Sequence, residues 1–366
     1  MGKFPRFIVG AVAGAAFLSA LPAYAGGEAG RLTLRDLGGR FVGYTTKPAV
    51  NGTADVTNGM FVQYMLPAER KHKYPLVLIH GGGGQGTDWL QTPDGRDGWA
   101  DYFVADGWDV YVVDRPGHGR SQGNAGCGDG KVGTANTGII SKLATSDANL
   151  WPGGAPTPTN PAVVGWTASG ATAPYCGDAL AAEKISALLG EIGPSILVAH
   201  SAGGGSTFRV PDLNPKNVVG IVAFEGVGSN PVAPGFNSSP ALITTWKTEP
   251  ALPQNFTATV AGNCPLQGAK PSKLVNYAKV PITLVGSNYG FKNMPPLIPG
   301  MSEPQDILKC ATESWKQAGV DASYVYLPDR GLKGGGHFAM AQKNSADYAK
   351  VFISLVTDIE KKAKKN

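Results

Sequence analysis

The stretch Val198-Ala199-His200-Ser201-Ala202-Gly203-Gly204 decides how the rest of this 366-residue chain is interpreted. The apolar run Ser195-Ile196-Leu197-Val198 comes directly before it and predicts a short buried strand, and the Gly- and Ser-rich residues after it can begin a helix. A strand that turns sharply into a helix around one serine is typical of a nucleophilic serine, here Ser201. The strained turn needs small residues two positions before and after the serine. Ala199 and Gly203 meet this need, although Gly is usual at both positions.

The composition is that of an ordinary globular protein with long loops. The chain is 42% hydrophobic and 16% charged, and its 51 Gly and 28 Pro follow no internal repeat. Its length is ample for one large core. The net charge is +5, and the dense basic cluster Lys361-Lys362-Ala363-Lys364-Lys365 is most simply the solvated end of a helix. We therefore expect no nucleic-acid partner.

The N-terminus has the three parts of a secretory signal peptide. Lys3 and Arg6 form a basic region, an apolar Ala-rich run follows, and Ala23-Tyr24-Ala25 is a small-x-small cleavage site. We expect residues 1–25 to be removed and residues 26–366 to form one secreted or periplasmic domain with no membrane span. An uncleaved anchor is the alternative, but the apolar run falls short of the about 20 residues that a spanning helix needs.

Apolar runs alternate with helical patterns along the chain, which predicts an α/β fold with a mostly parallel sheet and helices on both faces. Edge strands are expected at 32–34, 40–44 and 59–66, and buried strands at 75–79, 110–113, 195–198, 218–224, 281–285 and 324–327. Helices are expected near residue 87 or around 99–103, and at 178–191, 303–318 and 345–362.

Two loop-rich insertions interrupt this alternation, at about residues 122–177 and 227–278. Both are rich in Pro, Thr and Asn. Long irregular segments within a compact domain are usually functional or disordered. Because Trp151, Trp166 and Tyr175 of the first insertion need a surface to cover, we predict that it forms a lid over the site.

Four cysteines in an exported chain predict two disulfides, with three possible pairings. We favour Cys127 with Cys176 and Cys264 with Cys310, because each bond would then hold one insertion locally. None of these residues has the close spacing of a zinc site, so we expect no metal.

A serine hydroxyl needs a base within hydrogen-bond reach, and the base needs a carboxylate that orients it. His337 lies between the last expected strand and the last helix, where the base of such a site belongs, so we predict it to be the general base. His200 is expected to pack within the turn, His80 and His118 to order loops through hydrogen bonds, and His72 to be solvated.

The orienting carboxylate is predicted to be Glu225, which directly follows the apolar run 218–224. The more usual position follows the strand at 281–285, but Gly286-Ser287-Asn288-Tyr289 contains no carboxylate. The rival is Asp329, which lies close to His337 in the sequence but within a turn-forming stretch.

Two backbone N–H groups are needed to bind the oxyanion that forms during attack. Ala202 supplies one, directly after the serine, and Gly82 in the His80-Gly81-Gly82-Gly83 loop is predicted to supply the other. The same loop, 81–86, also matches the dinucleotide-binding pattern G-x-G-x-x-G. That alternative is disfavoured because the acidic residue expected on the second strand is misplaced.

Four motifs together resemble the α/β-hydrolase superfamily over roughly residues 60–362. They are HGGGG at 80–84, DRPGHGRS at 114–121, AHSAG at 199–203 and GGGHF at 334–338. More narrowly, HGGGGQGTDWLQTPDGRDGWADYF at 80–103 resembles a small group of secreted bacterial serine esterases. In that group the acid is a Glu after the strand that follows the nucleophile elbow, which is the sharp strand-to-helix turn around the serine, here Ser201.

This resemblance implies the triad Ser201, Glu225 and His337 and the oxyanion donors Gly82 and Ala202. It also supports the disulfide between Cys264 and Cys310. Described members of the group carry two adjacent cysteines in the oxyanion loop, whereas this chain has Gly82-Gly83. The lid segment differs as well, which leaves the substrate open.

The sequence thus predicts a secreted serine hydrolase that cleaves carboxylic esters through an acyl-enzyme, without a metal or organic cofactor. We expect a small-molecule ester with an apolar or aromatic part as substrate. An amidase or peptidase with the same triad, and a non-catalytic binding protein on a hydrolase fold, are the alternatives. The oligomeric state stays open.

Overall fold

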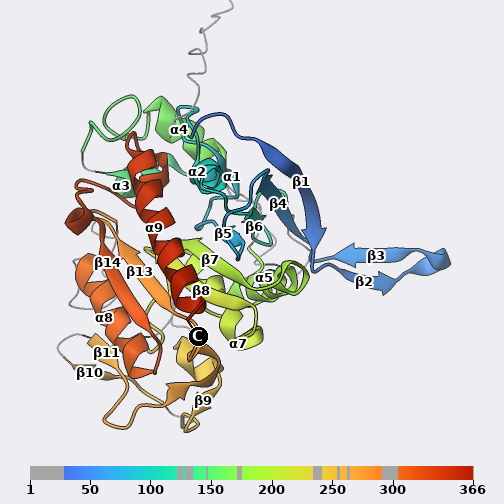
Figure 1. The fold of residues 1–366 in the computed structure, drawn as a ribbon, viewed down its shortest axis with the longest axis vertical. Coiled ribbons are helices and arrows are strands. Elements are labelled where there is room, and N and C mark those ends of the chain that lie inside the picture. Colours follow the sequence, from blue (N-terminus) through green and yellow to red (C-terminus); the bar gives the residue numbers. More distant parts are fainter. Residues whose placement is uncertain are drawn as a thin grey trace, which may run out of the picture.

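An eight-stranded sheet forms the centre of the molecule (Figure 1). The computed structural model describes residues 29–121, 127, 135–145, 147–170, 175–233, 241–253, 256–261, 264–290 and 304–365. The expected signal peptide lies outside these residues. The strands are β1 (Leu34–Val42), β4 (Met60–Pro67), β5 (Leu76–Ile79), β6 (Val110–Asp114), β7 (Ser195–His200), β8 (Val218–Phe224), β13 (Ile282–Gly286) and β14 (Ala322–Tyr326).

The strand order is β1-β4-β6-β5-β7-β8-β13-β14. The pairs β1–β4 and β4–β6 are antiparallel, and every other neighbouring pair is parallel. The predicted, mostly parallel sheet is therefore confirmed. Because parallel strands end at the same edge of a sheet, the loops after β5, β7, β8 and β13 meet there.

Helices cover both faces of the sheet, as predicted. One face packs against α2 (Trp99–Ala105) and α9 (Ser345–Ala363). The other packs against α5 (Asp178–Ile192) and α8 (Pro304–Gln317). Successive strand side chains alternate between the two cores, so Leu78 of β5 joins the first and Val77 the second. This alternation explains why the central strands read as continuous apolar runs.

Short helices lie between these elements. They are α1 (Thr87–Leu90), α6 (Gly203–Thr207) and α7 (Val210–Leu213), with 3-10 turns η5 (Leu327–Arg330) and η6 (Ala339–Ala341). The two alternatives for the first helix are both present, because α1 begins at Thr87 and α2 at Trp99.

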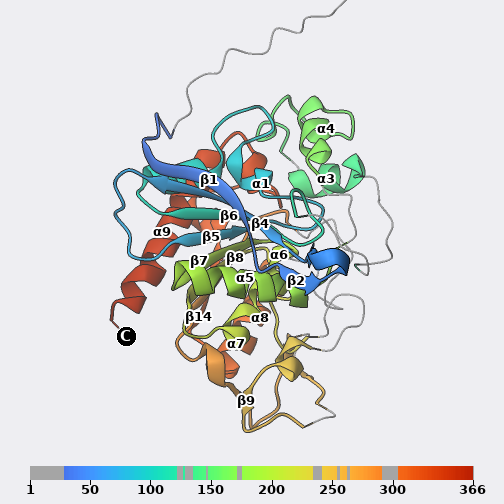
Figure 2. The same ribbon diagram turned by 90° about the vertical axis from the view of Figure 1, so that its right-hand side faces the viewer.

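The first insertion contains two helices that the sequence did not predict. They are α3 (Thr137–Ala144) and α4 (Pro161–Ala168), which pack against each other (Figure 2). Asn160 caps α4, since its side chain accepts from the N–H groups of Ala162 and Val163. A disulfide joins Cys127 to Cys176.

The second insertion is built from small two-stranded ladders. They comprise β9 (Thr248–Glu249) with β12 (Lys273–Leu274), β10 (Thr259–Ala261) with β11 (Cys264–Leu266), and the turns η3 (Leu242–Thr245) and η4 (Val275–Tyr277). The disulfide between Cys264 and Cys310 ties β11 to α8. Both favoured pairings are thus present in the structure.

The N-terminal β region differs from the prediction. Instead of two short strands, β1 is one strand of nine residues. A hairpin of β2 (Thr45–Pro48), η1 (Val50–Gly52) and β3 (Ala54–Thr57) follows and projects from the body (Figure 1). Its side chains are exposed on both faces, so the sequence lacks the apolar alternation that predicts a strand.

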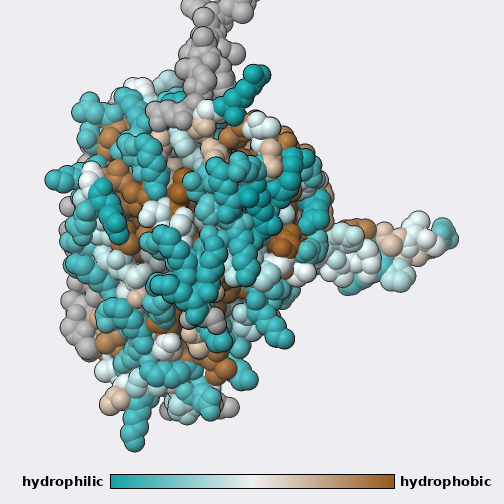
Figure 3. All heavy atoms as spheres, in the orientation of Figure 1, coloured by the Kyte–Doolittle hydropathy of each residue, from teal (hydrophilic) through white to brown (hydrophobic). Residues whose placement is uncertain are grey.

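Helix α9 crosses the face drawn in Figure 1, where the surface is mostly hydrophilic (Figure 3). Its last turn carries Lys361 and Lys362 of the basic cluster, as the sequence predicted. Within the described part of the chain, no helix combines the length and apolar character needed to cross a bilayer.

Candidate functional site

Ser201 lies in the sharp turn between β7 and α6. Its backbone φ is +50°, a value that a residue with a side chain rarely adopts. Three hydrogen bonds hold the turn. The N–H of Ser201 donates to the carbonyl of Phe224 at 3.0 Å, and its carbonyl accepts from the N–H groups of Gly204 and Val227 at 2.9 and 2.8 Å. The predicted elbow is therefore present, with Ser201 at its apex.

Glycines around the elbow are required by close backbone approaches. A Cβ atom at Gly203 would lie 2.5 Å from the carbonyl oxygen of His80, and one at Gly81 would lie 3.0 Å from the Cβ of Ser201. A Cβ at Gly82 would lie 3.2 Å from the Cβ of Ala202. The loop after β5 therefore packs directly on the elbow, which brings the two predicted oxyanion donors, Gly82 and Ala202, side by side.

Glu225 directly follows β8 and is fully buried. Its φ is +47°, and its N–H donates to the carbonyl of Val285 at 2.9 Å. The Oε2 atom accepts a hydrogen bond from Nδ1 of His337 at 2.5 Å. Among the described non-glycine residues, positive φ occurs only at Ser201, Glu225 and two asparagines, and asparagine tolerates it well. Strain is thus concentrated at the two predicted site residues.

Ser287 completes the surroundings of Glu225 and was not predicted from the sequence. Its N–H and its Oγ both donate to Oε1 of Glu225, at 2.9 and 2.5 Å. The N–H of Gly290 donates to Ser287 Oγ at 3.1 Å, and a Cβ at Gly290 would overlap both carboxylate oxygens. Ser287 lies after the strand predicted at 281–285, in the stretch that contains no carboxylate. The absence of an acid there was the signal in the sequence that could have pointed to Ser287.

His337 is held by its backbone as well as by Glu225. Its N–H donates to the carbonyl of Leu143 in α3 at 2.8 Å. Its carbonyl accepts from Nε2 of the buried His200 at 2.8 Å. Burial, together with the nearby His337, keeps the pKa of His200 well below its usual value, so this ring stays neutral. His200 therefore packs in the elbow as predicted and also anchors the loop that carries His337.

A pocket with a volume of about 350 Å³ brings these residues together. Ser201, His337, Gly82 and Ala202 line it. Apolar side chains of the first insertion line it as well, namely Ile139, Ile140 and Leu143 of α3 and Trp166 of α4. The two unpredicted helices thus contribute side chains to the pocket, and the action of this insertion as a lid stays a prediction.

Asp88 is the acidic side chain of this pocket and is 4% exposed. Its carboxyl group lies against the backbone of Gly84, just after the oxyanion loop. Burial raises the pKa of Asp88 to about 7, so both protonation states are accessible near neutral pH. The pocket is otherwise lined mainly by apolar and backbone groups, which suits an uncharged ligand with an apolar part.

The remaining histidines and the rival acid occupy other environments. Nδ1 of His80 donates to the carbonyl of Gly81 at 2.8 Å, and Nδ1 of His118 lies 3.4 Å from the carbonyl of Pro116, so both order loops as predicted. Asp329 is exposed in η5, whereas Glu225 is bonded to His337.

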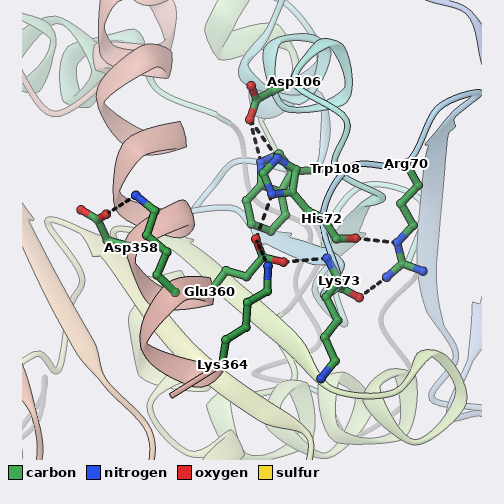
Figure 4. Close-up of polar contacts among 9 residues, drawn as sticks. Arg70, His72, Lys73, Asp106, Trp108, Asp358, Glu360 and Lys364 are labelled. Carbon is green, nitrogen blue, oxygen red and sulfur yellow. Dashed lines mark hydrogen bonds and ion pairs between the residues drawn. The ribbon is translucent and has the colours of Figure 1, made fainter. Parts of the chain in front are cut away.

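The prediction that His72 is solvated was wrong. Its ring stacks on Trp108 with centroids 3.7 Å apart, and its two nitrogens lie 3.2 Å from a carboxylate oxygen of Asp106 and 3.1 Å from one of Glu360 (Figure 4). Glu360 lies 288 residues away in the sequence, so local sequence carries no signal of this contact.

Comparison with known proteins shows the family and the fold. The family model for the alpha/beta hydrolase fold matches residues 74–272. A probable secreted lipase, phiG, from a fungal species (strain ATCC 74256) is 30% identical over 339 residues, which covers 81% of this chain and 85% of that protein. A solved structure of a bacterial esterase matches 91% of this chain and 99% of the esterase chain. The TM-score is 0.66 and the identity 20%, which shows the same fold.

Proposed function

Because the chain belongs to the α/β-hydrolase fold family, we propose that it is a secreted serine hydrolase that cleaves small carboxylic esters. The observation that carries this proposal is the hydrogen bond from His337 to the buried carboxylate of Glu225, because His337 lines the same pocket as the strained Ser201. A nucleophile, a base and an orienting acid are the groups that acyl transfer needs.

In the proposed first step, Ser201 Oγ attacks the acyl carbon and Nε2 of His337 takes the hydroxyl proton. Glu225 accepts the hydrogen bond from Nδ1, which fixes the tautomer and stabilises the imidazolium that forms. The N–H groups of Gly82 and Ala202 bind the oxyanion. The alcohol then leaves with the proton from His337, and an acyl-serine remains.

In the second step, water replaces the alcohol. His337 takes a proton from the water as the water oxygen attacks the acyl carbon, and the bond to Ser201 breaks as the proton returns to Oγ. The products are a carboxylic acid and the free enzyme.

The pocket lining supports an ester with an apolar acyl or alcohol part. Ile139, Ile140, Leu143, Trp166 and Phe338 offer apolar contact. The similarity to a lipase and to an esterase supports ester rather than amide hydrolysis. Secretion is supported by the fungal relative's description as secreted and by the two disulfides, which persist in oxidising compartments. N-terminal sequencing of exported protein should then begin at Gly26.

The test is Ser201→Ala with a panel of p-nitrophenyl esters and matched p-nitroanilides. We expect the wild type to hydrolyse esters and to be labelled by a fluorophosphonate probe. The variant should fold, lose labelling, and lose ester turnover by about 10⁴-fold or more, because the nucleophile is gone. Ser206→Ala is the control, since this serine lies in α6 and donates to the carbonyl of Gly203.

Two results would contradict the proposal. Ester turnover by purified Ser201→Ala at the wild-type rate would exclude a serine mechanism. A wild type that neither labels nor turns over any ester would favour a non-catalytic binding protein, and faster anilide than ester turnover would favour an amidase.

A further inference from the structure

Arg115 is a buried arginine directly behind the loop that carries Gly82. It follows β6 and is 1% exposed. Its Nη2 donates to the carbonyl of Gly81 at 2.8 Å, and its Nη1 donates to the carbonyl of Ala202 at 3.4 Å. A buried guanidinium is expensive to desolvate unless its donors are used. Here Nη1 and Nη2 bind the two backbone segments that hold the proposed oxyanion donors, while Nε has no hydrogen-bond partner among the described residues.

The carbonyl of Gly81 accepts a second hydrogen bond, from Nδ1 of His80 at 2.8 Å. The backbone N–H of Arg115 donates to Nε2 of the same ring at 3.0 Å, which places the ring proton on Nδ1. Burial, and then the charge of Arg115, hold the pKa of His80 well below its usual value. The neutral ring therefore keeps this tautomer, and two donors converge on one carbonyl oxygen.

The direction of the next N–H group follows from peptide geometry. The carbonyl of Gly81 and the N–H of Gly82 belong to one planar trans peptide, so they point in opposite directions. Anchoring the oxygen therefore fixes where the Gly82 N–H points. Hydrogen bonds to a carbonyl also polarise its peptide and strengthen the N–H as a donor. Without such anchors, a glycine-rich loop has the freedom to rotate this peptide.

Tyr175 holds Arg115 from the side of the first insertion. Nη1 of Arg115 donates to Tyr175 Oη at 3.1 Å, and the guanidinium lies 4.9 Å from the centre of the tyrosine ring. Tyr175 Oη in turn donates to Asp178 at the start of α5. The neighbouring Cys176 is bonded to Cys127. The same segment that closes the disulfide thus fixes the position of the arginine.

We propose that Arg115 is a positioning residue that orients the Gly82 peptide for oxyanion binding and that Tyr175 holds Arg115 in place. This inference rests on the proposed ester hydrolysis. It adds a chain of contacts from the insertion to the oxyanion donor, through Tyr175, Arg115 and Gly81. Arg115 acts through the peptide and does not touch the substrate.

The experiment compares Arg115→Met, Arg115→Lys and Tyr175→Phe with the wild type. Loss of one oxyanion donor lowers turnover by roughly 10²–10³-fold, so a misdirected donor should lower kcat by about 10–100-fold. KM should change less than about threefold, because the oxyanion exists only in the transition state. Arg115→Lys keeps the charge but loses the planar, forked set of guanidinium donors, so its kcat should lie between those of the wild type and Arg115→Met. Tyr175→Phe should lower kcat by roughly 3–10-fold.

A trifluoromethyl ketone provides the readout that a purely structural role would not change. Its adduct with the serine carries an oxyanion, so its affinity should fall in proportion to kcat/KM across the three variants. Arg96→Met is the matched control. Arg96 also donates to two backbone carbonyls, at 3.0 Å to Gln342 and 2.9 Å to Lys343, away from the oxyanion loop. Its kcat and its ketone affinity should match the wild type.

The proposal fails if Arg115→Met keeps the wild-type kcat, if its whole effect is in KM, or if ketone affinity does not follow kcat/KM. If Arg115→Met does not fold, Arg115→Lys and Tyr175→Phe decide by the same criteria. A failure of ester hydrolysis itself would be separate, since the wild type would then neither turn over esters nor label with the fluorophosphonate.

Discussion

At the scale of single residues, the site is marked by backbone conformations that oppose the preferences of its side chains. Ser201 and Glu225 both have positive φ, which costs roughly 1–3 kcal/mol each. Each lies directly after a central strand, and each is locked by backbone hydrogen bonds to a neighbouring strand end or loop. The sheet therefore offsets the strain and aims both side chains at the edge where its strands end.

Glu225→Gln tests whether the charge of this buried carboxylate orients the base. The amide keeps the size of the side chain but cannot stabilise the imidazolium, so kcat should fall by roughly 10³–10⁴-fold with the fold intact. The exposed Asp329 should contribute no transition-state charge, and Asp329→Asn should change kcat by less than about tenfold. The measurement is kcat on one chromogenic ester, with circular dichroism as the check on folding.

The opposite ranking of these two variants would refute the acid assignment. A harmless Glu225→Gln would mean that the 2.5 Å contact with His337 serves structure alone.

At the scale of elements, the C-terminal end of α3 is docked on the loop that carries His337. Leu143 accepts from the N–H of His337, and Thr145 Oγ1 donates to the carbonyl of Gly334 at 2.6 Å. Gln342 Nε2 donates to the carbonyl of Ala144 at 3.0 Å. A Cβ atom at Gly336 would lie only 1.6 Å from that same oxygen, so this position accepts only glycine.

Gly336→Ala should therefore separate α3 from the His337 loop. The added methyl group collides with backbone rather than with a flexible side chain, so the loop or the helix has to move. Because about 1 Å of misplacement can lower turnover by roughly 10²-fold, kcat should fall by at least tenfold, and the melting temperature should fall as well. Kinetics and thermal unfolding of the same preparation measure both effects.

Gly190→Ala is the matched control in α5, where a Cβ atom meets nothing within 4 Å. It should leave kcat unchanged and stabilise the protein by roughly 0.5–1 kcal/mol, because alanine is the better helix former. A fully active Gly336→Ala would show that α3 can shift without moving the base.

The elements that the sequence predicts well are those whose burial leaves a periodic pattern. The run 218–224 matches β8, and 345–362 nearly matches α9, because each carries an apolar pattern fixed by the sheet. Helices α3 and α4 were missed because they have only eight residues each and lie in a Gly- and Pro-rich segment. The signals available were the cap residue Asn136 before α3 and the cap-plus-proline start of α4, Asn160-Pro161.

The residues of the candidate site also divide into those that the sequence predicts and those that it does not. Ser201, Glu225 and His337 were predictable because each lies directly after a strand or in a loop whose place in the topology is fixed. Ser287 and Arg115 were not, because their roles depend on side-chain contacts across strands. Sequence order locates strand ends, but it does not show which polar groups meet across them.

At the scale of the whole molecule, a polar cluster just before β5 joins distant parts of the chain (Figure 4). Glu360 near the end of α9 accepts from the backbone N–H of Lys73 at 2.6 Å and lies 3.1 Å from Nδ1 of His72. Lys364 lies 3.4 Å from the same carboxylate. The cluster fastens the end of the last helix to the segment that leads into β5, at the opposite end of the strand from the oxyanion loop.

Glu360→Gln should weaken this attachment in a pH-dependent way. Burial disfavours the charged carboxylate, but the hydrogen bonds from Lys73 and His72 outweigh it and hold the pKa of Glu360 below its usual 4.5. A lowered folded-state pKa contributes stability that is present above the unfolded value and is lost as the pH falls through the folded one. At pH 7 the substitution should lower the free energy of unfolding by roughly 1–3 kcal/mol, since it weakens charged hydrogen bonds.

The difference between wild type and Glu360→Gln should hold from pH 7 to about 4.5 and then shrink as the wild-type carboxylate takes up a proton. Urea unfolding at pH 7, 4.5 and 3.5 measures it. Asp358→Asn is the control on the same helix, because its pair with Lys361 is exposed and should contribute less than about 1 kcal/mol at any of these pH values. An undiminished difference at pH 3.5 would mean that Glu360 acts by packing rather than by charge. If both variants lose less than about 1 kcal/mol in the free energy of unfolding, the polar cluster does not hold α9. The apolar face of the helix, with Phe352 and Ile359, would then be sufficient to fix it to the sheet.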